Sequence, residues 1–169
     1  MSLALASHLL PEIIFWAGII TGSIDLCAAL AFAATRGTRP KLVLQSIASA
    51  MIGPKAFSRN STVQLGLGLH YLIAFGAATT YAVASRYLTV LNEHSVLCGL
   101  LFGAAAYLFM TFVVIPLSAL NRPFSMSFFL GQLVINMACV GLPIALVVKD
   151  FPELFESLSE ILFSIIKGR

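Results

Sequence analysis

Among the polar side chains within the long apolar stretches of this sequence, five lie near the middle of their stretch and are of types that could do chemistry. They are Asp25, His70, Tyr107, Thr111 and Asn136. A carboxylate near the centre of a bilayer costs at least ~2.5 kcal/mol unless it is protonated or paired. Asp25 therefore needs a proton or a partner. His70 is the best partner because it is ionisable and lies at a similar depth, so we expect an Asp25–His70 hydrogen bond.

The depth of each polar residue follows from its place in its apolar stretch, at about 1.5 Å per residue. Asp25 and Tyr107 fall near the middle, and His70, Asn136 and Thr111 fall slightly to one side, so the polar groups form one layer. Such a layer can pin helices together through interhelical hydrogen bonds, each worth roughly 0.6 kcal/mol. It can equally mark a path for protons or solutes. The residues alone leave both interpretations open.

Other kinds of catalytic and cofactor site lack their parts. Haem held between histidines is disfavoured because His8 and His94 lie near or beyond the ends of apolar stretches. The sequence has no G-x-S-x-G turn, H-E-x-x-H pair or aspartate-rich run, which disfavours serine hydrolases, zinc proteases and metal-dependent transferases. The cysteines lie within apolar stretches without C-x-x-C spacing, at Cys27, Cys98 and Cys139. We therefore expect no enzyme, cofactor or metal.

The elements that position these residues are predicted from composition. Hydrophobic residues make up 59% of the 169-residue chain, charged residues only 10%, and the mean hydropathy is +0.97. Soluble domains carry roughly 25% charged residues, and one membrane crossing needs about 20 apolar residues. The sequence therefore predicts a single all-α membrane domain, a bundle of four transmembrane helices at about 13–34, 63–85, 95–119 and 127–148. We expect the first helix to be retained, because a cleaved signal peptide fits its length and charge poorly.

Two further segments are predicted to be helices that do not cross. The segment 41–52 has apolar residues at helical spacing between Pro40 and Gly53-Pro54, which indicates an interfacial helix after the first span. The segment 151–167 has one apolar stripe and an acidic polar face, which indicates an amphipathic C-terminal helix. Helices that adsorb to anionic lipid are usually basic. This helix therefore rests either on its own bundle or on a partner protein.

Small residues at intervals of four predict where helices approach one another closely. Gly18 and Gly22 form such a pair in the first span, and Gly99 and Gly103 form one in the third. These motifs let backbones meet where no hydrophobic effect drives helices together, and they serve equally for dimerisation. Pro116 is expected to bend only the end of its helix, and Pro143 likewise.

The distribution of positive charge predicts the orientation of the chain. The connection between the first two spans holds five basic residues and no acid: Arg36, Arg39, Lys41, Lys55 and Arg59. Cytoplasmic loops retain Lys and Arg. The first and third connections are therefore expected in the cytoplasm, with both termini on the opposite side. Anionic lipid headgroups suffice to explain the net charge of +3, so nucleic acid is not needed as a partner.

Several short stretches carry a resemblance to a known family. They are Gly18-Ile-Ile-Thr-Gly22-Ser-Ile-Asp25, Val43-Leu44-Gln45-Ser46-Ile47-Ala48-Ser49, Gly68-Leu69-His70-Tyr71-Leu72-Ile73-Ala74-Phe75, Phe112-Val113-Val114-Ile115-Pro116-Leu117-Ser118 and Val140-Gly141-Leu142-Pro143. Together they resemble small bacterial inner-membrane proteins related to YagU, over about residues 13–148. The resemblance implies a multi-pass protein of the bacterial inner membrane, so the termini that the charge distribution puts opposite the cytoplasm are expected in the periplasm. It implies no activity, because the family carries no established one.

Two functions remain as expectations. The first is a non-catalytic accessory or structural subunit that lies in the bilayer and joins a larger membrane complex or a homo-oligomer. The second is a small oligomeric transporter, or a proton-coupled permeation unit, that uses Asp25 and His70. Four helices are few for a transporter unless the chain oligomerises.

Overall fold

The computed structural model describes residues 9–119 and 125–167, and in the last helix it describes the backbone alone at Glu156 and at 158–167. Within this part the chain is helical apart from short turns and loops, with no strand. Four helical stretches are long and apolar enough to cross a membrane: Leu10–Thr35, Thr62–Tyr87, Ser95–Leu117 and Met126–Phe155. The prediction of a multi-pass helical bundle with four spans is therefore confirmed.

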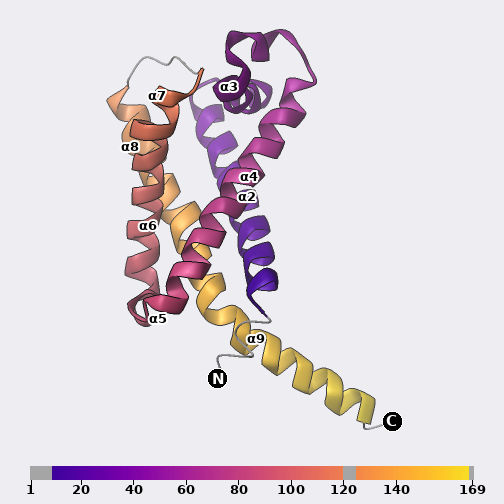
Figure 1. Ribbon diagram of the computed structural model, residues 1–169. Coiled ribbons are helices and arrows are strands. Elements are labelled where there is room, and N and C mark those ends of the chain that lie inside the picture. Colours follow the sequence, from indigo (N-terminus) through magenta and orange to yellow (C-terminus); the bar gives the residue numbers. More distant parts are fainter. Residues whose placement is uncertain (1–8, 120–124, 168–169) are drawn as a thin grey trace.

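The first two spans are uninterrupted helices, and the last two contain π-helical segments. The first span is α2 (Leu10–Thr35) and the second is α4 (Thr62–Tyr87). The third combines α6 (Ser95–Phe109), η2 (Met110–Val114) and α7 (Ile115–Leu117), and the fourth combines α8 (Met126–Ile135), η3 (Asn136–Gly141) and α9 (Leu142–Lys167). The short helix α5 (Val90–Glu93) joins α4 to α6. Figure 1 shows α2 and α4 crossing each other, with α6 beside the fourth span.

Most of the buried side chains in the bundle are small, and many large apolar ones point outward. Ala17 of α2, Ala78 of α4 and Ile144 of α9 are fully buried where these three helices meet. Outside the bundle, Leu72 is 66% exposed and Leu101 is 59% exposed. An aqueous protein would not leave many such side chains in water, whereas lipid tails solvate them at no cost.

The predicted glycine pairs lie where helices approach most closely. A Cβ at Gly22 would meet the Tyr71 ring of α4 at 2.8 Å, and one at Gly18 would overlap the Phe75 ring. In the third span, a Cβ at Gly99 would meet the Gly141 carbonyl oxygen at 2.8 Å, and one at Gly103 would overlap the backbone of Asn136. Gly18 and Gly22 thus admit aromatic rings from α4, while Gly99 and Gly103 let two backbones touch.

Helix α3 (Pro40–Ile52) occupies the segment predicted to be an interfacial helix, and the 3-10 turn η1 (Gly53–Ser58) follows it. Its polar side faces inward. Gln45 is fully buried, and its Nε2 donates to the backbone oxygen of Arg59 at 2.9 Å and to Thr62 Oγ1 at 3.3 Å. Met51 of the apolar stripe is 67% exposed. The helix is therefore attached to α4 through hydrogen bonds and presents apolar side chains to the surroundings.

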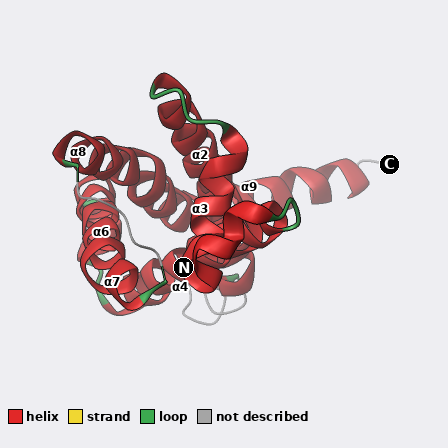
Figure 2. Cartoon of the chain, turned by 90° about the horizontal axis from the view of Figure 1, so that it is seen from above, coloured by secondary structure: helices red, strands yellow, loops and turns green. Residues whose placement is uncertain are grey.

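The fourth span and the predicted tail helix are one continuous helix, which corrects two predicted boundaries. We expected one helix to end near Val148 and another to begin near Phe151, but α9 runs without a break from Leu142 to Lys167. Charged residues end a membrane crossing without ending a helix, and Pro152 removes only one backbone hydrogen bond. Pro143 consequently lies in the first turn of α9, directly after η3, instead of near the end of its helix. Figures 1 and 2 show α9 extending well past the rest of the bundle.

Candidate functional site

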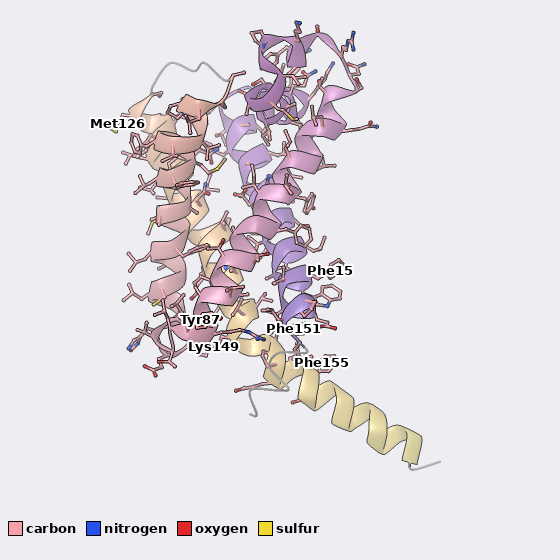
Figure 3. The ribbon with its side chains drawn as sticks, in the orientation of Figure 1. Phe15, Tyr87, Met126, Lys149, Phe151 and Phe155 are labelled. Atoms are coloured by element: carbon pink, nitrogen blue, oxygen red, sulfur yellow. The ribbon has the colours of Figure 1, made fainter. Side chains whose placement is uncertain are left out.

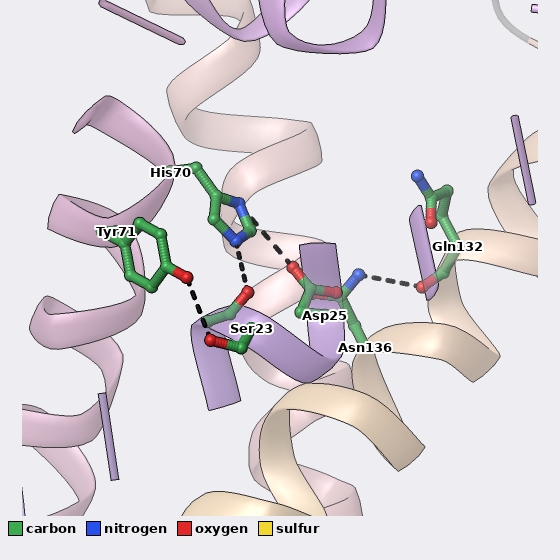
Figure 4. A network of polar contacts seen from close by, with 7 residues as sticks. Ser23, Asp25, His70, Tyr71, Gln132 and Asn136 are labelled. Carbon is green, nitrogen blue, oxygen red and sulfur yellow. Dashed lines mark hydrogen bonds and ion pairs between the residues drawn. The ribbon is translucent and has the colours of Figure 1, made fainter. Parts of the chain in front are cut away.

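Asp25 and His70 lie opposite each other where α2 packs against α4. The distance from His70 Nδ1 to Asp25 Oδ2 is 4.0 Å, and His70 is buried while the Asp25 side chain is 22% exposed. A direct hydrogen bond would require about 2.7–3.2 Å. The structure therefore brings the two predicted partners together at ion-pair distance, but it does not form the direct hydrogen bond that we expected (Figure 4).

The imidazole makes its hydrogen bond to the backbone of α2 instead. His70 Nε2–H donates to the carbonyl oxygen of Gly22 at 2.8 Å. Because a carbonyl can only accept, this bond fixes the proton on Nε2 and turns Nδ1 toward Asp25. Sequence reasoning assigned Gly22 to helix packing and missed its role as an acceptor, since a backbone carbonyl leaves no signal in residue type.

A second hydrogen bond beside the histidine also joins α2 to α4. Ser23 Oγ lies 2.9 Å from Tyr71 Oη, and the Tyr71 ring packs edge-on to His70 with the ring centroids 5.5 Å apart. Neither residue was among the predicted site residues. Their positions next to Gly22 and His70 in sequence are the only signal that could have found them.

Asn136 comes to the same place from the fourth span, at the start of the π-helical segment η3. Its Nδ2 donates to the backbone oxygen of Gln132 at 2.9 Å. Because that oxygen can only accept, the bond fixes which end of the amide is Nδ2, and Oδ1 remains as an acceptor on the other side. Figure 4 shows the Asn136 side chain beside Asp25.

These residues surround a small cavity of about 60 Å³ between the four spans. Its polar lining comes from Thr21, Asp25, His70 and Asn136, and the rest is apolar. Thr21 is only 1% exposed, and its Oγ1 has no hydrogen-bond partner among the described residues. Sequence reasoning missed Thr21, although its place one helical turn before Asp25 puts both on the same side of α2.

Tyr107 and Thr111, the other two members of the predicted layer, do not line this cavity. The Tyr107 ring packs on Phe129 of α8 with centroids 5.4 Å apart. The hydroxyl of Thr111 is buried in η2 with no hydrogen-bond partner in the described part of the chain. The third span instead contributes Ala106 and Met110 to the cavity, so the five-residue layer divides into three residues at the cavity and two away from it.

A larger hollow of about 400 Å³ lies between the beginning of α2 and the part of α9 that leaves the bundle. Its lining is almost entirely apolar: Trp16, Ile20, Leu146, Val147, Asp150, Phe151 and Leu154. Figure 3 shows Phe15 of α2 and Phe151 and Phe155 of α9 at this end of the molecule. We call this hollow the α2/α9 groove.

The described residues contain no cluster that could bind a metal ion and no disulfide. No group of three or more His, Cys, Asp or Glu side chains is close enough there to hold a metal ion. Cys27, Cys98 and Cys139 are free.

Comparisons with known proteins gave no family to which this chain can be assigned. No protein-family model, no curated protein and no solved structure matches it. What the chain does must be argued from its own residues.

Proposed function

We propose that this chain is a non-catalytic accessory subunit of the bacterial inner membrane that binds a partner membrane protein along α9. The observation that carries the proposal is that α9 leaves the bundle and continues beyond it, opening the α2/α9 groove at the point of departure. We also propose that the chain is related to the YagU-like inner-membrane proteins that its motifs resemble.

The position of the exposed apolar residues favours a protein partner over lipid at the end of the groove. Lys149, Asp150 and Glu153 follow one another along α9, which places this part of the helix at the edge of the bilayer. Leu154 and Phe155 lie directly after them and are 58% and 45% exposed. Apolar side chains at the edge of the hydrocarbon region gain free energy by packing against another surface.

Charge complementarity narrows the kind of partner. The sequence of the extended half of α9 is acidic over its first turns, at Asp150, Glu153, Glu156 and Glu160. An acidic helix is repelled by the negative surface potential of anionic lipid. It is attracted to a protein that presents Lys or Arg beside an apolar strip. The proposed partner is therefore a membrane protein with a basic segment at the membrane surface.

The orientation in the membrane forms part of the same proposal. The first and third connections would lie in the cytoplasm and both termini in the periplasm, since the basic residues gather on the first connection. Helix α3 would rest in the cytoplasmic interface, with Met51 and its other apolar residues toward lipid. The extended part of α9 would then meet its partner at the periplasmic surface.

Site-specific photocross-linking in intact cells tests the accessory role. A photoreactive amino acid at Leu154 should give one discrete protein adduct, whereas the same group at Leu101, equally exposed on α6, should give none. Charge reversal by Glu153→Lys should reduce the Leu154 adduct several-fold, because it opposes the basic partner. Equal labelling from both positions, or no effect of charge reversal, would contradict the proposal.

A second candidate function is a proton-coupled permeation unit, and the central cavity is the specific observation in its favour. Asp25, His70 and Asn136 meet there from three different spans. Four helices make a small transporter, so this function would require several copies. Proton flux into vesicles that contain the purified protein, lost in Asp25→Asn, would support it. If neither the wild-type protein nor Asp25→Asn conducts protons, the accessory role is the only one of the two candidates that remains.

A further inference from the structure

The hydrogen bond to Gly22 limits where protons can lie around Asp25. His70 Nε2 keeps its proton because it donates to the Gly22 carbonyl, so only Nδ1 and the Asp25 carboxyl remain to be protonated. If both were bare, a lone pair and a carboxylate would face each other across a largely buried site, with no described donor between them. One proton between them removes this conflict. It lies either on Asp25 or on Nδ1, and the pair is electrically neutral in both cases.

The distance between the two groups leaves room for a bridging water beside them. At 4.0 Å the Nδ1 and Oδ2 atoms are too far apart to share a proton directly. A polar contact longer than about 3.5 Å is commonly bridged by water. The adjoining cavity of about 60 Å³ has space for a water molecule, which occupies about 30 Å³ in the liquid.

The walls of the cavity supply the partners that a bound water requires. Thr21 is 1% exposed and its hydroxyl has no protein partner in the described residues, so it is a donor without an acceptor. Asn136 Oδ1 is an acceptor, because the bond to Gln132 fixes which end of the amide is Nδ2. A water that accepts from Thr21 and donates to Asn136 still has one lone pair and one hydrogen for the Asp25–His70 pair.

We propose that the cavity binds water, and that Asp25 and His70 share a single proton through it, which makes a proton-binding site among the four spans. When the proton moves from Asp25 to Nδ1, the water passes one proton on as it receives another, and no net charge enters the membrane. This inference goes beyond the accessory role and does not depend on it, because the α2/α9 groove uses other residues.

Spectroscopy on the full-length protein in lipid nanodiscs tests the shared proton. Nitrogen-15 NMR of labelled histidine reports the protons on each ring nitrogen, with His70 identified by its loss in His70→Gln. Infrared spectroscopy reports protonated Asp25 through a carboxyl band that is lost in Asp25→Asn. We expect a proton on Nε2 throughout, and protonation of either Nδ1 or Asp25 near neutral pH. A bare Nε2, or a bare Nδ1 together with ionised Asp25, would overturn the proposal.

Two threonines provide a matched test of the water. Thr21 and Thr111 both have buried hydroxyls without a protein partner, but only Thr21 lines the cavity. Thr21→Val should lower the thermal midpoint by about 2–4 °C and weaken the magnetisation transfer from water to His70. Thr111→Val should leave both unchanged or raise the midpoint. If Thr21→Val has no more effect on either measurement than Thr111→Val, the hydroxyl holds no water and the bridge is wrong.

Discussion

Asp25 and His70 meet because α2 and α4 pack side by side, with the imidazole held to the α2 backbone by its hydrogen bond to the Gly22 carbonyl. The His70 bond to Gly22 joins the two helices whether or not Asp25 is charged. The Asp25 carboxyl lies 4.0 Å away and is still partly exposed. His70 therefore has two roles, since it joins α2 to α4 and also faces the only described acid beside the central cavity.

A double-mutant cycle separates these roles. His70→Ala should lower the free energy of unfolding by about 1–3 kcal/mol, because it leaves Asp25 and the Gly22 carbonyl without their partner. Asp25→Asn should cost less than about 1 kcal/mol, since an amide still forms hydrogen bonds and carries no charge to solvate. Reversible unfolding in mixed micelles measures both.

The combined variant shows whether the pair interacts. The double variant should lose an amount of unfolding free energy that differs from the sum of the two single losses by more than about 0.5 kcal/mol. Independent sites add to within that range. Additive losses would show that the two side chains do not interact, despite their proximity. Coupling without any effect on proton or solute flux would assign the pair a structural role.

At the scale of the elements, the third and fourth spans meet backbone to backbone. Gly99 and Gly103 lie against the backbone around Gly141 and Asn136, within the π-helical segment η3. A π turn widens the helix and is frequent at functional sites. Here it carries Asn136 into the cavity and brings its backbone against Gly103. The polar site and the close packing of these spans therefore depend on the same segment.

Two glycine substitutions test this contact against a matched control. At Gly103 a Cβ would overlap the Asn136 carbonyl and lie 2.8 Å from Met137 Cα, whereas at Gly76 it would meet nothing within 4 Å. Gly103→Ala should cost about 1–3 kcal/mol, because backbone atoms cannot move aside as a flexible side chain can. Gly76→Ala should be neutral or stabilise α4 by up to about 1 kcal/mol. The same unfolding assay measures both, and equal effects would show that the backbones do not touch.

For the whole molecule, charge distinguishes the two ends of the bundle. The end that carries α3 and η1 has five basic residues and no acid between Arg36 and Arg59. The end where α2 begins and α9 departs carries both signs, among them Glu12, Glu93, Lys149 and Asp150. This asymmetry predicts which end faces the cytoplasm, because retention of Lys and Arg decides the orientation of most helical membrane proteins.

Reporter fusions measure this orientation. After Ser58 in the first connection, a reporter enzyme that works only in the cytoplasm should be active. After Arg169, a reporter enzyme that works only in the periplasm should be active. An insertion after Glu93, between the second and third spans, serves as the control and should report the same side as Arg169. The reverse pattern would overturn both the orientation and the periplasmic position of the α9 partner surface.

The sequence by itself determined the number of spans and the approximate ends of the first three, as well as the closeness of Asp25 to His70. These properties are local, because each residue in lipid contributes to crossing mainly through its own polarity, and depth is counted along one helix at a time. The sequence likewise predicted that the glycine pairs lie at close helix contacts, since only small residues permit close approach.

The tertiary structure decided which side of each helix faces which neighbour. Successive residues turn by about 100° around a helix, so Ala106 and Met110 line the cavity while Tyr107 and Thr111 do not. The π segments further change the direction in which the following side chains point around the helix axis. No spacing in the sequence predicts the size of that change. The fully buried Thr21, the Gly22 carbonyl and the inward-facing Gln45 depend on the same rotations. A pattern along one helix carries no information about its rotation against another, because packing of the whole bundle sets that rotation.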